Sequence, residues 1–353
     1  MQTLVFKIQE SNPNPPEMRR LGEIIKEGGL VAFPTETVYG LGGDALNPES
    51  SRKIYAAKGR PSDNPLIVHI ADINDLKVLT DEFPESGRKL AERFWPGPLT
   101  MIVKKSAAVP TETTGGLDTV AIRFPSHRVA GELIKAAGGF IAAPSANLSG
   151  KPSPTLAKYV LEDMDGRVDA IIDGGDIPIG LESTIVDLTG PKPVILRPGY
   201  ITKEMLSEVL GEVETDPTIL DGTSSERPKA PGMRYRHYAP KGELTIVEGN
   251  RDEVIARINE ELRNASLNGL KTGVIATSEN SDVYRADSIK IIGSRDREEQ
   301  IAASLYRILR EFDDENVEAI YSESFSSEGF GCAIMNRLLK AAGHKKINLW
   351  EDA

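Results

Sequence analysis

The stretch from Glu214 to Lys241 most constrains how this chain can fold. It is rich in Pro, Gly, Ser and Thr and has neither helical nor strand periodicity, a composition that is typical of a linker. With 353 residues, the chain is also longer than a usual single domain. We therefore predict a first domain over residues 1–212, a linker over 213–242 and a second domain over 243–353.

The second part alternates between strand-like and helix-like segments. We expect strands at 244–247, 273–276, 289–292 and 319–322, and helices at 252–264, 298–312 and 333–342. Strands that alternate with helices are typical of a parallel sheet. The pattern predicts a small, Rossmann-like parallel α/β domain.

The first part mixes its elements less regularly. Strand-like runs occur at 4–8, 30–33, 66–70, 99–103, 120–124, 140–143, 170–173, 183–188 and 194–196, with helical patterns between some of them. This irregular order favours a twisted mixed sheet with flanking helices over a regular doubly wound sheet.

A helix with a cation at its end is predicted over residues 48–58. Asn47 suits the N-cap, Pro48 the first helical position and Gly59 the C-terminal stop. Lys58 then lies at the negative end of the helix dipole, which alone would explain a cation there. Arg60 follows outside the helix, where its guanidinium can bind a phosphate or a carboxylate in a bidentate manner.

A second polar group follows the short apolar run that ends at Ala143. Ser145 and Asn147 are two residues apart, so in an extended chain their side chains face the same side. Such a pair can also simply bond the turn backbone. Together with Lys58 and Arg60, it can hold a polar anion over a sheet.

The common nucleotide-binding motifs are a poor fit. Residues 40–45 match a loosened dinucleotide pattern, but the helix starts too late, and we expect a flexible turn there instead. Gly150-Lys151 is followed by Pro152 and is therefore not a P-loop. Phosphates of a nucleotide would have to be held by side chains and turns.

Composition narrows the class of protein. The formal charge of −11 argues against a protein that mainly coats nucleic acid. Cys332 is the only cysteine, which excludes an intrachain disulfide, and the four His show no metal-ligand spacing. The sequence has no signal-like segment and no apolar run of membrane-spanning length, so we expect a cytoplasmic protein.

Three motifs together resemble one family. The first motif is the stretch 34–42, PTETVYGLG. It is followed by Lys58-Gly59-Arg60-Pro61 and later by Ser145-Ala146-Asn147. The chain thus resembles the YrdC-like L-threonylcarbamoyladenylate synthases, in their longer form with a C-terminal extra domain. The resemblance implies a nucleotidyltransferase that makes threonylcarbamoyl-AMP and pyrophosphate from L-threonine, bicarbonate or CO₂, and ATP. The product would feed tRNA threonylcarbamoyladenosine formation by a separate transferase complex.

The same resemblance assigns site residues. Lys58 and Arg60 are the implied catalytic charge stabilisers. Positions expected to contact ATP are Lys58, Arg60, Ser62, Ser145, Asn147, Ser153, Arg197 and Tyr235. Positions expected around L-threonine are Thr35, His69, Arg123, Ala143 and Ser183. Mg²⁺ would arrive with ATP, because no carboxylate cage for it is visible.

Two of these residues can also be explained by a structural role alone. His69 lies in an apolar run, where a core histidine is common, and Ser183 can cap the strand that it precedes. A structural role explains Arg123 less well, because a cation inside an apolar strand needs a partner. A substrate carboxylate would be such a partner.

The linker carries an unexpected charge bias. Residues 227–241, RPKAPGMRYRHYAPK, contain five basic residues and no acidic one. By resemblance this segment folds over the nucleotide, and we predict a lid in which Tyr235 reaches ATP. The alternative left open is that the segment binds tRNA phosphates weakly.

Two other functions fit the sequence less well. An RNA-binding module that recognises double-stranded or tRNA shape is disfavoured by the acidic charge and by the lack of an aromatic stacking platform. A domain acting on carbamoyl phosphate is disfavoured because zinc-finger cysteines and an acylphosphatase-like segment are missing.

Overall fold

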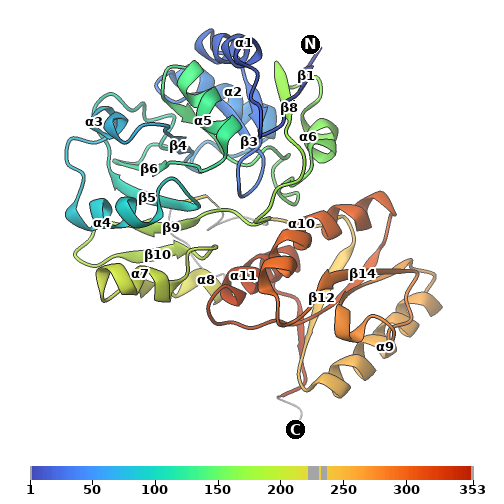
Figure 1. Ribbon diagram of the computed structural model, residues 1–353. Helices are drawn as coiled ribbons and strands as arrows, with labels where there is room; N and C mark the ends of the chain where they lie inside the picture. The colour runs from blue at the N-terminus through green and yellow to red at the C-terminus, as the bar shows by residue number, and fades with distance from the viewer. Residues whose placement is uncertain (1, 222–229, 232–236, 351–353) are drawn as a thin grey trace. The chain divides into compact units, whose positions relative to one another are not determined.

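The computed structural model describes residues 2–221, 230–231 and 237–350. The chain forms two compact units, one of Met1–Ser149 with Ser153–Arg234 and the other of Gly150–Pro152 with Tyr235–Ala353 (Figure 1). Among the described helices, none combines the length and the hydrophobicity that crossing a bilayer would need.

An eleven-stranded mixed sheet runs through the described part of the first unit. Its strands follow the spatial order β1-β8-β2-β3-β7-β4-β6-β5-β9-β10-β11. Their bounds are β1 Leu4–Lys7, β2 Val31–Phe33, β3 Gly40–Asp44, β4 Ile67–His69, β5 Leu99–Lys104, β6 Thr119–Arg123, β7 Ile141–Ala142, β8 Ala170–Asp173, β9 Thr184–Asp187, β10 Val194–Arg197 and β11 Glu214–Thr215. The predicted twisted mixed sheet is confirmed.

Helices cover both faces of this sheet. Along the β2 segment, Leu30 and Ala32 pack into one hydrophobic core, while Val31 and Phe33 pack into another that includes α1 and α5. This alternation is expected for a strand that is buried on both sides. The helices are α1 Pro15–Lys26, α2 Pro48–Lys58, α3 Leu76–Leu79, α4 Glu85–Phe94, α5 Arg128–Ala136, α6 Ala157–Met164, α7 Lys203–Leu210 and α8 Thr218–Asp221, with a short 3₁₀ turn at Ile73–Asp75.

The glycine-rich stretch that was expected to be a flexible turn is strand β3, so that prediction is wrong. Strand β3 pairs with β2 on one side and with β7 on the other. A Cβ atom at Gly42 would lie 2.7 Å from Ile141 Cγ2 and 2.8 Å from Phe33 Cε1. Gly42 is therefore needed for close packing of the sheet against its neighbours.

The predicted helix over 48–58 is present as α2. The Asn47 side chain accepts a hydrogen bond from the Glu49 backbone N–H, and Gly59 adopts the left-handed conformation at φ +62°. Local capping signals thus fix where this helix ends and where Lys58 lies.

The described residues of the second unit form a five-stranded parallel sheet with the order β14-β13-β15-β12-β16. Its elements are β12 Glu243–Glu248, α9 Arg251–Leu267, β13 Thr272–Thr277, β14 Ser288–Gly293, α10 Glu298–Asp314, β15 Ala319–Glu323, α11 Gly331–Ala341 and β16 Lys346–Asn348, with a 3₁₀ turn at Ser278–Asn280. This confirms the predicted parallel α/β domain, although β16 was not foreseen.

The stretch predicted to be linker is not featureless at its start. Strand β11 pairs in parallel with β10, and the short helix α8 follows it. Most of the basic segment after it, including Tyr235, lies outside the described residues.

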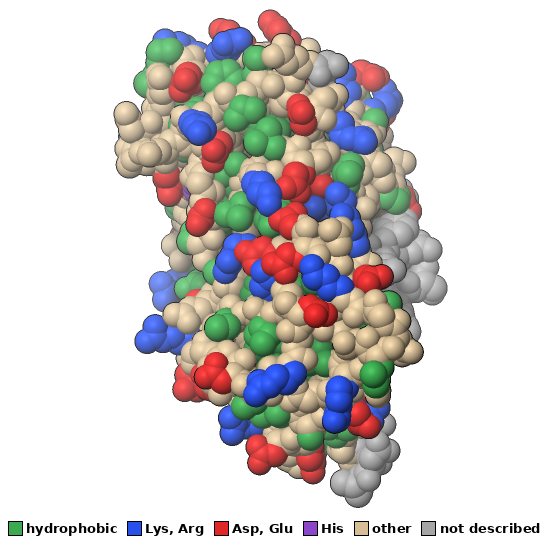
Figure 2. Space-filling model, turned by 90° about the vertical axis from the view of Figure 1, so that its right-hand side faces the viewer, with side chains coloured by type: hydrophobic (Ala, Val, Ile, Leu, Met, Phe, Trp, Pro, Cys, Tyr) green, Lys and Arg blue, Asp and Glu red, His purple; other side chains and the backbone are tan. Residues whose placement is uncertain are grey.

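Charges are mixed on the face drawn in Figure 2. Lys and Arg side chains are interspersed there with Asp and Glu side chains over the described residues. That face therefore does not present the single-sign surface that is typical of a nucleic-acid-binding module.

Candidate active site

Two predicted threonine-site residues end neighbouring parallel strands. His69 is the last residue of β4 and Arg123 the last of β6, and the two are paired in register. On the other side of Arg123, Thr100 of β5 is its register partner. Since the carboxyl ends of parallel strands share one edge, this edge collects polar side chains from separate segments.

Arg123 has an acidic partner that the sequence analysis did not name. One guanidinium nitrogen lies 2.8 Å from Glu36 Oε1, and the two side chains are only 5% and 9% exposed. Among the described residues, Arg123 Nε and Glu36 Oε2 have no hydrogen-bond partner. Buried polar atoms without partners are costly, so this pair is suited to a ligand that carries both charges.

His69 is held neutral by its surroundings. Its Nδ1 lies 3.1 Å from the Ile67 carbonyl oxygen, and its ring makes an edge contact with Phe33. Burial, helped by the positive charge of Arg123, lowers the pKa of His69 from 6.5 to about 3. A neutral imidazole adds no second positive charge next to the Arg123 guanidinium.

A hydroxyl network lies next to Arg123. Ser183 Oγ is 2.7 Å from Thr100 Oγ1, and Arg197 donates to Ser183 Oγ at 3.1 Å and to the Ser183 carbonyl oxygen at 3.0 Å. Arg197 was assigned to the nucleotide and Ser183 to threonine. Their direct contact means that the two predicted subsites share one network.

The Lys58 ammonium holds the predicted Ser-Ala-Asn turn. It donates to the carbonyl oxygens of Ser145 and Asn147, and Asn147 Oδ1 lies 3.5 Å from it. Ser145 in turn donates to Asn147 Oδ1 at 2.5 Å. Lys58, Ser145 and Asn147 therefore form a single cluster, in which Lys58 and Asn147 are buried and Ser145 is half-buried.

The sheet connects this cluster to the Arg123 edge. Phe33, which contacts the His69 ring, is the register partner of Gly40, and Gly40 forms a bridge with Ser145. Ala143, which is one of the predicted threonine-site residues, donates its N–H to the carbonyl oxygen of Ile67 in β4. Both predicted subsites thus lie on adjoining strands.

Arg60 makes different contacts from those expected. Its guanidinium donates to Asn64 Oδ1 at 2.6 Å and to the carbonyl oxygens of Asn64 and Pro65. Arg60 is nearly buried, whereas Ser62 is exposed. Arg60 therefore also shapes the turn that it begins.

Three further predicted residues are placed as follows. Thr35 donates to the Val38 carbonyl oxygen at 2.7 Å and pairs with Thr37, so its hydroxyl shapes the loop after β2. Ser153 donates to Glu182 Oε1 at 2.6 Å. Tyr235 lies outside the described residues.

Glu36 is the main residue that motif reading missed. Glu36 lies in the signature stretch PTETVYGLG, three residues after β2 ends at Phe33, and the motif gives it no role. A buried cation such as Arg123 indicates that an acidic partner is needed, but the sequence pattern does not show which acid that is.

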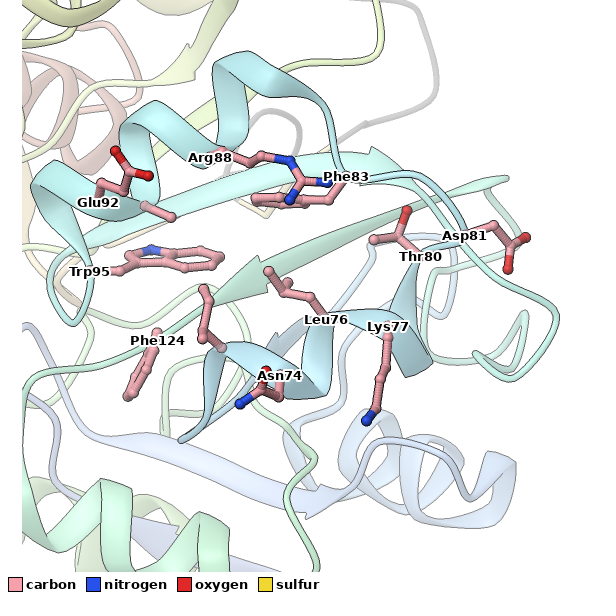
Figure 3. Close-up of a pocket in the computed structure, with 12 residues that line it drawn as sticks. Asn74, Leu76, Lys77, Thr80, Asp81, Phe83, Arg88, Glu92, Trp95 and Phe124 are labelled. Carbon is pink, nitrogen blue, oxygen red and sulfur yellow. The ribbon is translucent and has the colours of Figure 1, made fainter.

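A separate cavity of about 570 Å³ lies between α3 and α4, and none of the predicted site residues lines it. Figure 3 shows Trp95 and Phe83 on one side and Leu76 on the other; the Trp95 and Phe83 rings stack with their centroids 6.3 Å apart. Its lining also includes two cations, Lys77 and Arg88, and two acids, Asp81 and Glu92. We assign no role in the proposed chemistry to this cavity.

Known families match both units of the chain. A family model described as "Telomere recombination" matches residues 23–199, and one described as "Threonylcarbamoyl-AMP synthase, C-terminal domain" matches residues 201–343.

Full-length relatives carry the same name. A threonylcarbamoyl-AMP synthase of Pyrococcus abyssi is 49% identical over 94% of this chain and 96% of its own length. One of Bacillus subtilis is 49% identical over 96% of each. The crystal structure of P. abyssi Sua5 complexed with L-threonine superposes with a TM-score of 0.93, at 47% identity, over 98% of this chain and all of that one. These matches confirm the resemblance seen in the motifs, and the chain belongs to the threonylcarbamoyl-AMP synthase family in its long, two-domain form.

Proposed function

We propose that this protein is a threonylcarbamoyl-AMP synthase that uses L-threonine, bicarbonate or CO₂, and ATP. The observation that carries the proposal is the likeness to enzymes of that name over nearly the whole chain. In the proposed reaction the threonine amine loses a proton and adds to CO₂, which gives a carbamate. A carbamate oxygen then attacks the α-phosphorus, the bond to the bridging oxygen breaks and pyrophosphate leaves.

The Arg123–Glu36 pair is our candidate for binding L-threonine. Both side chains are buried, and each keeps an unpartnered polar atom among the described residues. An amino acid supplies a carboxylate for Arg123 and an amine for Glu36, so it would satisfy both atoms at once. The neutral state of His69 keeps the local charge matched to a zwitterion.

The Ser183 network is our candidate for recognising the threonine hydroxyl. Thr100, Ser183 and Arg197 are all buried and bonded to one another through Ser183, and Thr100 is the register partner of Arg123. A site that hydrogen-bonds a substrate hydroxyl discriminates strongly against analogues that lack it.

The Lys58 cluster is our candidate for the phosphates of ATP. The Lys58 ammonium is held by two carbonyl oxygens in a region of low solvent access. Such a charge stabilises the negative charge that builds up on the phosphates as pyrophosphate leaves. Arg60 and Arg197 would extend the positive field if their present contacts rearrange on ATP binding.

Mg²⁺ is proposed to bind mainly through ATP. Among the described residues no three His, Cys, Asp or Glu side chains lie together as a metal site. Mg²⁺ is commonly held by substrate phosphates with few protein ligands.

Pyrophosphate release tests the proposal. The full chain is incubated with L-threonine, bicarbonate and ATP, each omitted in turn, and the adenylate is identified by mass spectrometry. We expect release only with all three substrates. Release that does not require L-threonine would show that the assigned amino acid is wrong, and transfer of the product to tRNA should need a separate transferase.

A further inference from the structure

A cavity of about 240 Å³ opens at the carboxyl edge of the parallel sheet in the second unit. It is lined by Gly249, Arg251, Val254, Arg295, Glu323 and Ser324. These residues lie at the end of β15 and in the segments that follow β12, β14 and β15. The site uses no residue of the proposed active site and does not depend on the proposed function.

The topology of the sheet creates this cavity. β12 and β15 are neighbours, but β12 continues through α9 toward β13, whereas β15 continues through α11 toward β16 on the other side. Because crossovers are right-handed, opposite directions place α9 and α11 on opposite faces of the sheet (Figure 1). The two connections therefore leave the carboxyl ends of β12 and β15 toward opposite faces of the sheet and leave a crevice between them. Ligands of open α/β sheets bind in a crevice of this kind.

A buried carboxylate fixes one of the two arginines. Glu323 is 1% exposed and accepts hydrogen bonds from Asn280 Nδ2 and the Tyr284 hydroxyl, each at 3.0 Å, and from Arg295. Burial and the charge of Glu323 raise the pKa of Tyr284, so its hydroxyl is a neutral donor. The Glu323 carboxylate is thus occupied by internal donors, and it orients Arg295.

The same asparagine fixes the other arginine. Asn280 Oδ1 accepts from Arg251 Nε at 2.9 Å and from its terminal nitrogen at 2.7 Å. Asn280 therefore links Arg251 to the Glu323 and Arg295 pair across the cavity. Both arginine side chains remain open to solvent, at 61% and 43% exposure.

The cations of this cluster are its solvent-facing charges. Arg251 and Arg295 are balanced in number by Glu323 and Glu279, but Glu323 is buried, and Glu279 accepts from the Ser294 hydroxyl and the Arg295 N–H. The nearest carboxylate oxygen to Arg251, on Asp252, is 4.0 Å away. An arrangement that only tied strand ends together would not need two solvent-facing guanidinium groups over a cavity.

We propose that the C-terminal unit binds a small oxyanion, a phosphate or a carboxylate, between Arg251 and Arg295. Guanidinium groups match both anions through paired N–H donors. The cavity is smaller than a typical drug-sized pocket of about 300–1,000 Å³. It therefore suits an anionic group with few attached atoms better than a whole nucleoside triphosphate.

Hydrogen exchange on the full chain locates the site. Inorganic phosphate, pyrophosphate, AMP and malonate are added separately, and backbone protection is followed by mass spectrometry in segments 249–254, 293–297 and 321–326. We expect protection there with at least one probe, and the pattern separates a free phosphate, a nucleotide phosphate and a carboxylate source. No protection with any of the four at millimolar concentration would overturn the proposal.

A matched pair of variants ties the protection to Arg251. We expect R251Q to weaken binding about tenfold or more, since a charge-assisted hydrogen bond is removed. R257Q on the same helix is the control, because Arg257 pairs with Glu260 and Glu261 instead. Unchanged binding in R251Q, with an unchanged melting temperature, would contradict the assignment. Loss in both variants would point to non-specific charge attraction.

Discussion

The Arg123 guanidinium and the Glu36 carboxylate meet 2.8 Å apart at the carboxyl end of β6, in a part of the first unit that is almost closed to solvent. A buried ion pair of this kind is expensive to assemble, and breaking it by removing one charge typically costs about 3–5 kcal/mol. Such a pair with unpartnered atoms is more easily explained by a ligand than by stability.

Glu36→Gln should weaken L-threonine binding at least about tenfold and leave ATP binding nearly unchanged. The variant keeps the shape of Glu36 but removes the charge that faces the substrate amine. Calorimetric titration with each substrate measures both effects. Glu49→Gln is the control, since Glu49 is an exposed partner of Arg52. Equal loss of threonine and ATP affinity would indicate general damage to the fold.

Lys58→Met should abolish most turnover and also lower the free energy of unfolding by about 1–3 kcal/mol, because buried carbonyl oxygens lose their donor. This stability loss exceeds what a helix-end cation alone would contribute. Single-turnover pyrophosphate release and urea denaturation report the two effects. Lys104→Met, at an exposed strand end, should change neither. Normal turnover in the Lys58 variant would remove its role at the phosphates.

Arg60→Ala should lower both turnover and stability. From the sequence alone the fold would be expected to survive intact, because Arg60 follows its helix. Its guanidinium is instead used by Asn64 and Pro65, which makes the substitution structurally costly. Arg60→Lys separates the effects, because it keeps the charge but loses the fork. Full turnover by Arg60→Lys at reduced stability would mean that only the charge matters in catalysis.

Local signals explain which parts of this site could be predicted. Asn47 and Pro48 mark the start of α2 and Gly59 marks its end, so the position of Lys58 could be read from the residues next to it. The Arg123 and Glu36 pair depends on the spatial order of β2 and β6, which hydrophobic periodicity does not encode. Gly42 was misread because a glycine-rich strand needs a tertiary reason, here the closeness of Phe33 and Ile141.

The serine and valine analogues test hydroxyl recognition. Serine keeps the hydroxyl and loses a methyl group, so it should be a poorer but detectable substrate. Valine replaces the hydroxyl by a methyl group and should be much worse, because buried donors and acceptors would be left unpaired. Ser183→Ala should narrow the gap between threonine and valine in kcat/KM. Equal rates with valine in the unaltered enzyme would remove the role given to Ser183.

The depressed pKa of His69 predicts a stability loss in mild acid. Between its ordinary pKa of 6.5 and its folded value of about 3, the unfolded chain binds a proton at His69 that the folded chain does not. Unfolding therefore takes up a proton in this window, and stability falls as the pH falls, by up to about 1.4 kcal/mol per pH unit from this residue. Above pH 6.5 His69 contributes no pH dependence. His69→Gln, which cannot titrate, should lose correspondingly less stability between pH 7 and pH 5 than the unaltered chain. Urea denaturation of both proteins at each pH measures the difference, in which shared contributions from other groups such as His127 cancel. Parallel losses in the two proteins would show that His69 is not held neutral by the fold.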